Sequence, residues 1–204
     1  MIAIIDYGVG NLFSLQSSFG AIGEEAVVTA DEKVISAADR LILPGVGAFE
    51  DAATKLRDSG MADVVKREAA SGKPIMGICL GMQLLLDKSF EYGEHEGLGL
   101  IKGNVRPIAD VIDSGLKIPH IGWNRLIVKK PSPLFKYLKD GDCVYFVHSY
   151  YAADYNDVTS VAEYSAELTA SIERGNVYGC QFHPEKSGEV GLKILKAFCE
   201  IETN

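Results

Sequence analysis

The sequence Pro-Ile-Met-Gly-Ile-Cys-Leu-Gly at residues 74–81 decides the fold, because it predicts a buried strand that passes directly into a helix. Residues 74–79 form a short apolar run typical of a strand in a protein core, and residues 80–87 predict an apolar helix. Gly77 and Gly81 flank Cys79 and allow a sharp turn between the two elements. A strand followed at once by a helix is the repeating unit of a parallel α/β sheet.

Toward the N-terminus, short apolar runs alternate with longer amphipathic segments. The predicted strands lie at residues 2–6, 25–29 and 40–43, and the predicted helices lie at residues 12–22, 48–58 and 61–71. Asn11 is placed to cap the first of these helices. The alternation predicts a doubly wound, mostly parallel sheet with helices on both faces.

The second half of the chain is richer in extended structure. We expect extended segments at residues 97–108, 123–129, 143–148, 158–163, 168–173 and 177–182, and a closing helix at residues 188–201. These segments predict an antiparallel extension of the parallel sheet. No linker or repeat divides the chain, so we expect a single α/β domain over residues 1–204.

Composition narrows the functional classes. The 204 residues are 47% hydrophobic, enough for one buried core, and the formal net charge of -8 argues against nucleic-acid binding. No signal peptide is recognisable and no apolar run reaches ~18 residues, so we expect a cytoplasmic protein. The cysteines form no C-x-x-C pair, which argues against a disulfide framework or a metal site, and we expect no cofactor. Packing is the expected role of Cys143, Cys180 and Cys199.

Cys79 stands where a strand-to-helix turn presents a nucleophile. The pattern Gly-x-Cys-x-Gly matches the nucleophile elbow of hydrolases, with cysteine in place of serine. The following helix directs free N–H groups and its positive dipole end at the sulfur, which favours the thiolate. The N–H of Leu80 is placed to bind a developing oxyanion. The alternative is a buried, inert cysteine in an ordinary turn.

His183 is the candidate base. It follows the extended segment 177–182, and it shares an edge of the sheet with Cys79 if both strands are parallel, because active sites of open α/β sheets lie at the carboxyl ends of strands. Glu185 is close enough in sequence to accept the second imidazole N–H and to fix the tautomer. The alternative is a histidine that caps a strand beside an exposed glutamate.

The sequence Leu-Pro-Gly-Val-Gly at residues 43–47 follows another predicted strand. Its glycines let backbone N–H groups of Gly45 and Val46 approach a ligand closely and complete an oxyanion hole. An ordinary β-to-α turn uses the same residue types. Three signals, each at the carboxyl end of a strand, together predict a Cys-His-Glu hydrolytic site.

These three segments resemble, in order along the chain, the motifs of the class I glutamine amidotransferases, and the resemblance covers the whole chain. The elbow reads Gly-Ile-Cys-Leu-Gly-Met-Gln at residues 77–83, and the final motif reads Phe-His-Pro-Glu at residues 182–185. The subgroup that the chain resembles is the glutaminase-subunit family of imidazole glycerol phosphate synthases, through residues 44–49, 119–124, 148–150 and 183–187. Sister glutaminases of anthranilate and GMP synthesis usually have other residues at Val46, Met82 and Lys186.

The resemblance implies a mechanism of glutamine hydrolysis. Cys79 attacks the side-chain amide and forms a thioester, while His183 protonates the departing ammonia and then activates water, with Glu185 supporting its charge. The implied oxyanion donors are the N–H groups of Gly45, Val46 and Leu80, and the implied glutamine-binding residues are Gln83, Ser149 and Tyr150. The alternatives are a solvent-facing helix position for Gln83 and strand-end packing for the other two.

A single domain of this size leaves no room for a second site that uses the ammonia. The resemblance implies a heterodimer with a (β/α)₈-barrel cyclase subunit, which uses the ammonia to make imidazole glycerol phosphate and an aminoimidazole carboxamide ribonucleotide in histidine biosynthesis. The candidate interface residues are Asn11, His120, Trp123, Asn124 and Lys186. Trp123 lies between glycine and asparagine, an unusual place for a core residue, and tryptophan is enriched at interfaces. A core Trp123 and a loop His120 are the alternative.

Other interpretations stay open at this point. They are another glutaminase of the class, such as the pyridoxal phosphate synthase subunit, a γ-glutamyl hydrolase that acts alone, and a non-catalytic binding or stress-response protein. Trp123 and Lys186 argue against the first, and the complete set of Cys79, His183 and Glu185 disfavours the last. Because glycines at 45 and 47 permit a peptide flip, we expect the isolated chain to be nearly inactive.

Overall fold

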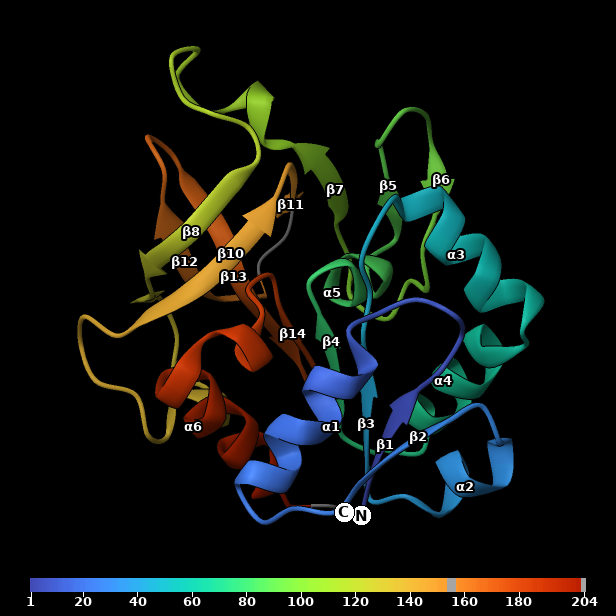
Figure 1. The fold of residues 1–204 in the computed structure, drawn as a ribbon. Coiled ribbons are helices and arrows are strands. Elements are labelled where there is room, and N and C mark those ends of the chain that lie inside the picture. Colours follow the sequence, from blue (N-terminus) through green and yellow to red (C-terminus); the bar gives the residue numbers. More distant parts are fainter. Residues whose placement is uncertain (154–156, 203–204) are drawn as a thin grey trace.

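The computed structural model describes residues 1–153 and 157–202 (Figure 1). Its centre is an eight-stranded sheet with the order β2-β1-β3-β4-β14-β13-β12-β9. The parallel part contains β1 (Ile2–Ile5), β2 (Ala26–Thr29), β3 (Arg40–Leu43), β4 (Ile75–Ile78) and β14 (Val177–Cys180). The antiparallel part contains β13 (Glu167–Arg174), β12 (Val158–Glu163) and β9 (Ile127–Val128). The predicted fold class is confirmed.

Helices cover both faces of the parallel part, as predicted (Figure 1). One face carries α1 (Leu12–Ala21) and α6 (Gly188–Cys199), and the other carries α2 (Glu32–Ala37), α3 (Phe49–Asp58), α4 (Met61–Ala70) and α5 (Leu80–Leu84). Successive side chains of β1 point to opposite faces of the sheet and pack in different cores. Ile2 and Ile4 belong to the core beneath α1 and α6, whereas Ala3 and Ile5 belong to the core beneath α2, α3 and α4.

Two smaller sheets, which the sequence did not predict as separate units, lie beside the main one. β8 (His120–Arg125) and β10 (Cys143–His148) form an antiparallel pair, and β11 (Tyr150–Ala153), β7 (Asn104–Pro107), β5 (Lys88–Ser89) and β6 (His95–Glu96) form the other sheet. Short 3₁₀ turns are η1 (Ile108–Asp110), η2 (Pro133–Phe135) and η3 (Pro184–Lys186).

Three local predictions are wrong. The predicted helix 80–87 ends at Leu84, because the carbonyl oxygens of Leu84 and Leu85 accept from the N–H groups of Leu98 and Leu100. Leu98 and Leu100 use their N–H groups to bond the carbonyl groups at the end of α5, so this part of the chain does not pair in a sheet. Only Asn104–Pro107 of the predicted segment 97–108 is a strand. Asn11 occupies the N-cap position of α1 but makes no side-chain capping bond.

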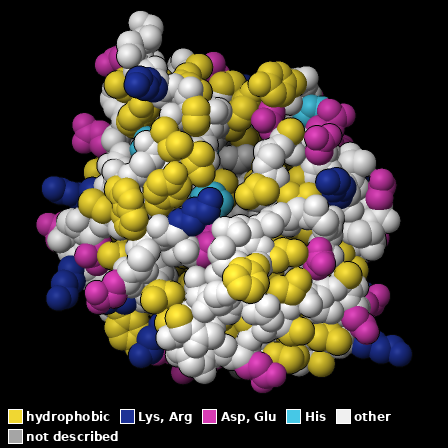
Figure 2. Space-filling view, viewed as in Figure 1, with side chains coloured by type: hydrophobic (Ala, Val, Ile, Leu, Met, Phe, Trp, Pro, Cys, Tyr) yellow, Lys and Arg dark blue, Asp and Glu magenta, His cyan; other side chains and the backbone are white. Residues whose placement is uncertain are grey.

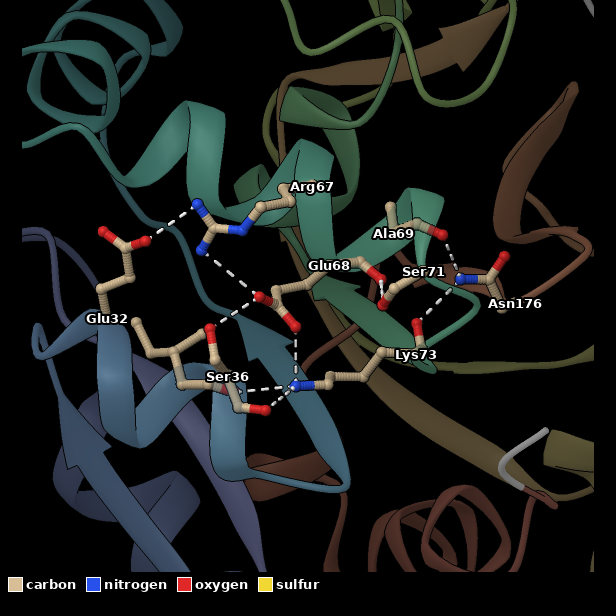
Figure 3. Close-up of polar contacts among 9 residues, drawn as sticks. Glu32, Ser36, Arg67, Glu68, Ala69, Ser71, Lys73 and Asn176 are labelled. Atoms are coloured by element: carbon tan, nitrogen blue, oxygen red, sulfur yellow. Dashed lines mark hydrogen bonds and ion pairs between the residues drawn. The ribbon is translucent and has the colours of Figure 1, made fainter.

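A buried polar network joins α2 and α4 near the amino-terminal ends of β4 and β14 (Figure 3). Glu68 is 6% exposed; its carboxylate accepts from the Ser36 hydroxyl at 2.8 Å and pairs with Lys73 Nζ at 2.7 Å. Lys73 Nζ also donates to two carbonyl oxygens of α2, and Asn176 Nδ2 donates to two carbonyl oxygens around the α4–β4 turn. These bonds fix the connection that leads into β4.

Among the described residues, no helix is long and apolar enough to cross a membrane, and no group of three or more His, Cys, Asp or Glu side chains is arranged to hold a metal ion. All four cysteines are free thiols.

Candidate active site

Cys79 occupies the turn between β4 and α5 in a strained backbone conformation. Its φ is 55° and its ψ is -112°, values that non-glycine residues rarely adopt. The flanking glycines are required by contact, because a Cβ at Gly77 would lie 2.6 Å from the carbonyl oxygen of Gly81. A Cβ at Gly81 would collide with the carbonyl oxygen of Leu43. Packing on all sides therefore holds the strained turn, as is common at functional sites.

The loop after β3 lies directly against this turn. A Cβ at Gly45 would lie 2.6 Å from the backbone nitrogen of Gly81 and 3.0 Å from the carbonyl carbon of Leu80. The Tyr7 hydroxyl donates to the carbonyl oxygen of Pro44 at 2.6 Å and holds the loop in place. Burial and the neighbouring Cys79 raise the pKa of Tyr7. The structure thus brings the predicted oxyanion segment next to the elbow, and it adds Tyr7, which the sequence analysis missed.

His183 lies on the same edge of the sheet as Cys79. β14 pairs in parallel with β4, with Cys180 opposite Ile78, so both strands end at that edge, as the sequence analysis required. Glu185 Oε1 lies 2.8 Å from His183 Nδ1. Because a carboxylate accepts, Nδ1 carries the proton and Nε2 is left for chemistry.

The electrostatic environment of His183 favours the imidazolium. Burial opposes the charge, but hydrogen bonding to Cys79 and Glu185 outweighs it and raises the pKa of His183 to about 9. The side chains of His183 and Glu185 are 3% and 1% exposed, so water screens their interaction little. Glu185 Oε2 is buried without a hydrogen-bond partner among the described residues. A cation beside a cysteine sulfur stabilises the thiolate and prepares it for attack.

Two buried glutamines form one side of the site. Gln83 is 5% exposed, so the solvent-facing alternative is wrong. Its Nε2 donates to the carbonyl oxygen of Tyr150 at 3.1 Å and to Oε1 of Gln181 at 2.9 Å. Gln181 Nε2 lies 3.7 Å from the sulfur of Cys79. Gln181 was not predicted as a site residue, and the only signal in the sequence was its position directly after the strand that leads to His183.

Cys79, Gln83 and His183 face a cavity of about 520 Å³. The predicted residues that line it are Val46, Cys79, Leu80, Gln83, Ser149, Tyr150, His183 and Lys186. Glu91 and Tyr92 line the wall as well and were not predicted. Glu91 brings a carboxylate to the cavity. The same carboxylate accepts from the N–H of Phe49 at 2.6 Å, where α3 begins after the loop that follows β3.

Most of the predicted interface residues lie outside the cavity wall. Trp123 is 58% exposed, so the alternative of a core tryptophan is wrong. His120 is 3% exposed, and its ring faces His148 rather than solvent. Asn124 and Asn11 are partly exposed, and Lys186 lies at the cavity itself.

Exposed apolar side chains gather over β8 on the face shown in Figure 2. Ile118, Ile121 and Trp123 are each about half exposed or more, at 46%, 59% and 58%. Ile118 also lines the cavity, so the apolar patch continues to its opening. Apolar surface next to a polar cavity is typical of a protein interaction site.

The family model of Glutamine amidotransferase class-I matches residues 3–201. The chain therefore belongs to the class-I glutamine amidotransferases. The protein named imidazole glycerol phosphate synthase subunit HisH from Caldanaerobacter subterraneus subsp. tengcongensis is 53% identical over 203 residues, and the match covers 98% of each chain. The protein of the same name from Lactococcus lactis is 49% identical over 201 residues, again with 98% of each chain covered. Within the class, the chain thus belongs to the HisH family.

Solved structures agree with the fold. A crystal structure described as a glutamine amidotransferase superposes with a TM-score of 0.75 at 18% identity, covering 98% of this chain and 100% of the other. PurLQS from Thermotoga maritima gives a TM-score of 0.75 at 23% identity, covering 97% of this chain and 96% of the other. At these identities the likeness concerns the fold alone.

Proposed function

We propose that the chain is the glutaminase subunit of an imidazole glycerol phosphate synthase, which hydrolyses glutamine at Cys79 and passes ammonia to a cyclase subunit. The observation that carries the chemistry is the buried arrangement of Cys79, His183 and Glu185 at one edge of the sheet, with His183 bound to Glu185 at 2.8 Å. The name shared by the relatives supports the biosynthetic step, and "subunit" in that name supports the need for a partner.

The geometry supports a thioester route. The Cys79 sulfur attacks the carbonyl carbon of the glutamine amide, and the oxyanion that forms is bound by the N–H of Leu80 and by N–H groups of the Gly45–Val46 segment. His183 gives its Nε2 proton to the leaving nitrogen, so ammonia departs and the thioester remains. Neutral His183 then takes a proton from water, which attacks the thioester and releases glutamate and the thiolate. Each oxyanion donor is expected to lower the activation barrier by about 3 kcal/mol.

Glutamine recognition is assigned to the cavity wall. Ser149, Tyr150 and Gln83 line the cavity, and the Gln83 amide donates to the Tyr150 carbonyl. Glutamine also carries an α-ammonium group, for which the Glu91 carboxylate offers a charge partner. Attack by the thiolate, proton transfer by His183 and hydrolysis by water make up the whole proposed route, so this route calls for no cofactor.

The partner is proposed to be a (β/α)₈-barrel cyclase subunit in the cytoplasm. The exposed Trp123 and the apolar surface beside the cavity support a contact there. Lys186 at the cavity, with Asn11 and Asn124, would complete the contact. Ammonia released into water is protonated at neutral pH, which is why direct transfer across this interface is required.

The test is glutamate release from glutamine by the chain alone, by the chain with the cyclase, and by the chain with the cyclase and its nucleotide ligand. We expect full activity only in the third mixture. Equal activity of the isolated chain would identify a hydrolase that acts alone. Absence of glutamate in all three mixtures, with folded proteins and ammonia-dependent synthesis intact, would refute the glutaminase assignment.

A further inference from the structure

A continuous series of hydrogen bonds connects β8 with the sulfur of Cys79. Its midpoint is the carbonyl oxygen of Tyr150, which accepts from His148 Nδ1 at 2.8 Å and from Gln83 Nε2 at 3.1 Å. A carbonyl oxygen only accepts, so both nitrogen atoms must be donors. This one acceptor therefore fixes the orientation of a histidine on one side and of a glutamine on the other.

Toward the active site, the orientation passes from Gln83 to Gln181. The Gln83 nitrogen that donates to Tyr150 also lies 2.9 Å from the side-chain oxygen of Gln181. Gln181 is 0% exposed, and with its oxygen held by this donor its Nε2 points at the Cys79 sulfur, 3.7 Å away. A hydrogen bond from an amide to sulfur is stronger when the sulfur is an anion.

Away from the active site, the same logic fixes two histidines. Because His148 donates through Nδ1, its Nε2 must accept, and the donor is Nδ1 of His120 at 2.9 Å. His120 Nε2 is then an acceptor for Asn124 Nδ2 at 3.2 Å, and Asn124 also donates to the carbonyl oxygen of Glu163. Burial lowers the pKa of His148 to about 4 and also lowers the pKa of His120, so both rings are neutral at pH 7, as this arrangement requires.

We propose that Gln181 is a further catalytic residue, which donates a hydrogen bond to the Cys79 sulfur and favours the thiolate. Gln83, His148 and His120 act as positioning residues, because they hold the Gln181 amide with its nitrogen toward the sulfur. A reversed amide would present lone pairs to the sulfur and oppose its charge. The inference deepens the proposed function, since it rests on Cys79 as the nucleophile.

The test is alkylation of Cys79 by iodoacetamide in the full chain, followed by peptide mass spectrometry across a pH series. Gln181→Met keeps the length of the side chain and removes the donor, and Gln181→Glu keeps its shape and places oxygen beside the sulfur. We expect alkylation at neutral pH to slow about tenfold in the first variant and further in the second, with the pH profile moved upward. Gln16→Glu makes the same change at an exposed position of α1, so it is the matched control and should leave the alkylation profile unchanged.

The positioning residues are tested by non-additivity. His148→Phe removes the donor to Tyr150, so we expect a smaller upward shift of the alkylation profile. Combined with Gln181→Met it should add nothing, because the orientation of a missing amide no longer matters. Full additivity of the two effects would refute the positioning role.

Unchanged alkylation in both folded Gln181 variants would overturn the proposal. If circular dichroism shows that the variants do not fold, NMR on the unaltered chain decides. The Gln181 side-chain amide protons should then shift as Cys79 titrates, and they should not do so in Cys79→Ala; no shift in the unaltered chain would also overturn it. Alkylation needs neither glutamine nor partner. Dependence of alkylation on Gln181 without glutaminase activity under any condition would refute the proposed function, and it would leave standing only the hydrogen bond from Gln181 to the Cys79 sulfur.

Discussion

Two buried polar networks lie at opposite ends of β4 and β14, and they are built differently. At the amino-terminal ends, both oxygens of Glu68 are bonded, one to Ser36 and the other to Lys73 (Figure 3). At the carboxyl-terminal ends, Cys79 has a strained backbone, and one oxygen of Glu185 is buried without a partner among the described residues. A fully satisfied network stabilises the fold, whereas strain and unmet hydrogen bonding mark the place where chemistry occurs.

The two networks also respond to pH in opposite directions. Burial raises the pKa of Glu68, but the Lys73 and Ser36 bonds outweigh it and lower the pKa overall. Glu68 therefore contributes stability above its ordinary pKa and loses it as pH falls. The pKa of His183 is raised to about 9, so its contribution is complete below its ordinary value of 6.5 and is lost as pH rises through about 9. Acid therefore weakens the Glu68 network at the amino-terminal ends of the strands, and base weakens the His183 network at their carboxyl-terminal ends.

The largest effect should follow from Cys79→Ser. We expect glutamine hydrolysis by the complex to fall by at least ~10⁴-fold, because no other group replaces the thiolate. Ammonia-dependent synthesis should persist, since the cyclase does not need Cys79. Both are measured as product formation with glutamine or ammonium as nitrogen source, and retained glutamine hydrolysis would remove Cys79 from the mechanism.

Glu185→Gln should lower kcat by roughly 10²–10⁴-fold, because the shape is kept while the charge that supports the imidazolium is lost. The NMR titration midpoint of His183 should fall from about 9 toward its ordinary range. Glu167→Gln, which alters an exposed ion pair with Lys129, is the control and should change neither quantity. A titration midpoint that stays near 9 in Glu185→Gln would show that Glu185 does not set the charge of His183.

Lys73→Met should affect stability rather than catalysis. Removing the cation leaves the buried Glu68 carboxylate with only the Ser36 hydroxyl and the half-exposed Arg67 guanidinium, 3.3 Å away, as partners. We expect the free energy of unfolding to fall by ~3 kcal/mol in urea denaturation. Lys129→Met, at the exposed pair with Glu167, should cost at most ~1 kcal/mol. The contrast between the two networks fails if Lys73→Met lowers kcat per folded molecule.

Trp123→Ala should give the smallest effect, confined to the partner. The exposed indole contributes little to the fold, so the melting temperature should stay close to that of the unaltered chain. Affinity for the cyclase, measured by calorimetry, should fall by roughly 2 kcal/mol. A variant that unfolds would mean that Trp123 supports the structure instead.

Local pattern was enough to predict the parallel sheet, the strained turn at Cys79 and the position of His183, because each depends on a short strand and its next residues. The pairing of β8 with β10 could not be predicted, since it joins segments that are distant in sequence. The burial of His120 follows from that pairing, and so does its bond to His148. The orientation of Gln181 needs the atomic positions of Gln83 and Tyr150, which no sequence pattern specifies.

The most direct measurement is covalent labelling of the liganded complex with an electrophilic diazoketone analogue of glutamine, followed by peptide mapping. We predict one label per chain, on Cys79, with loss of glutamine hydrolysis in proportion to labelling. Cys143, Cys180 and Cys199 should remain unlabelled, and Cys79→Ala should take up no label. Inactivation with the label on any other residue, or glutamine hydrolysis that continues after Cys79 is fully labelled, would contradict the assignment of Cys79 as the nucleophile.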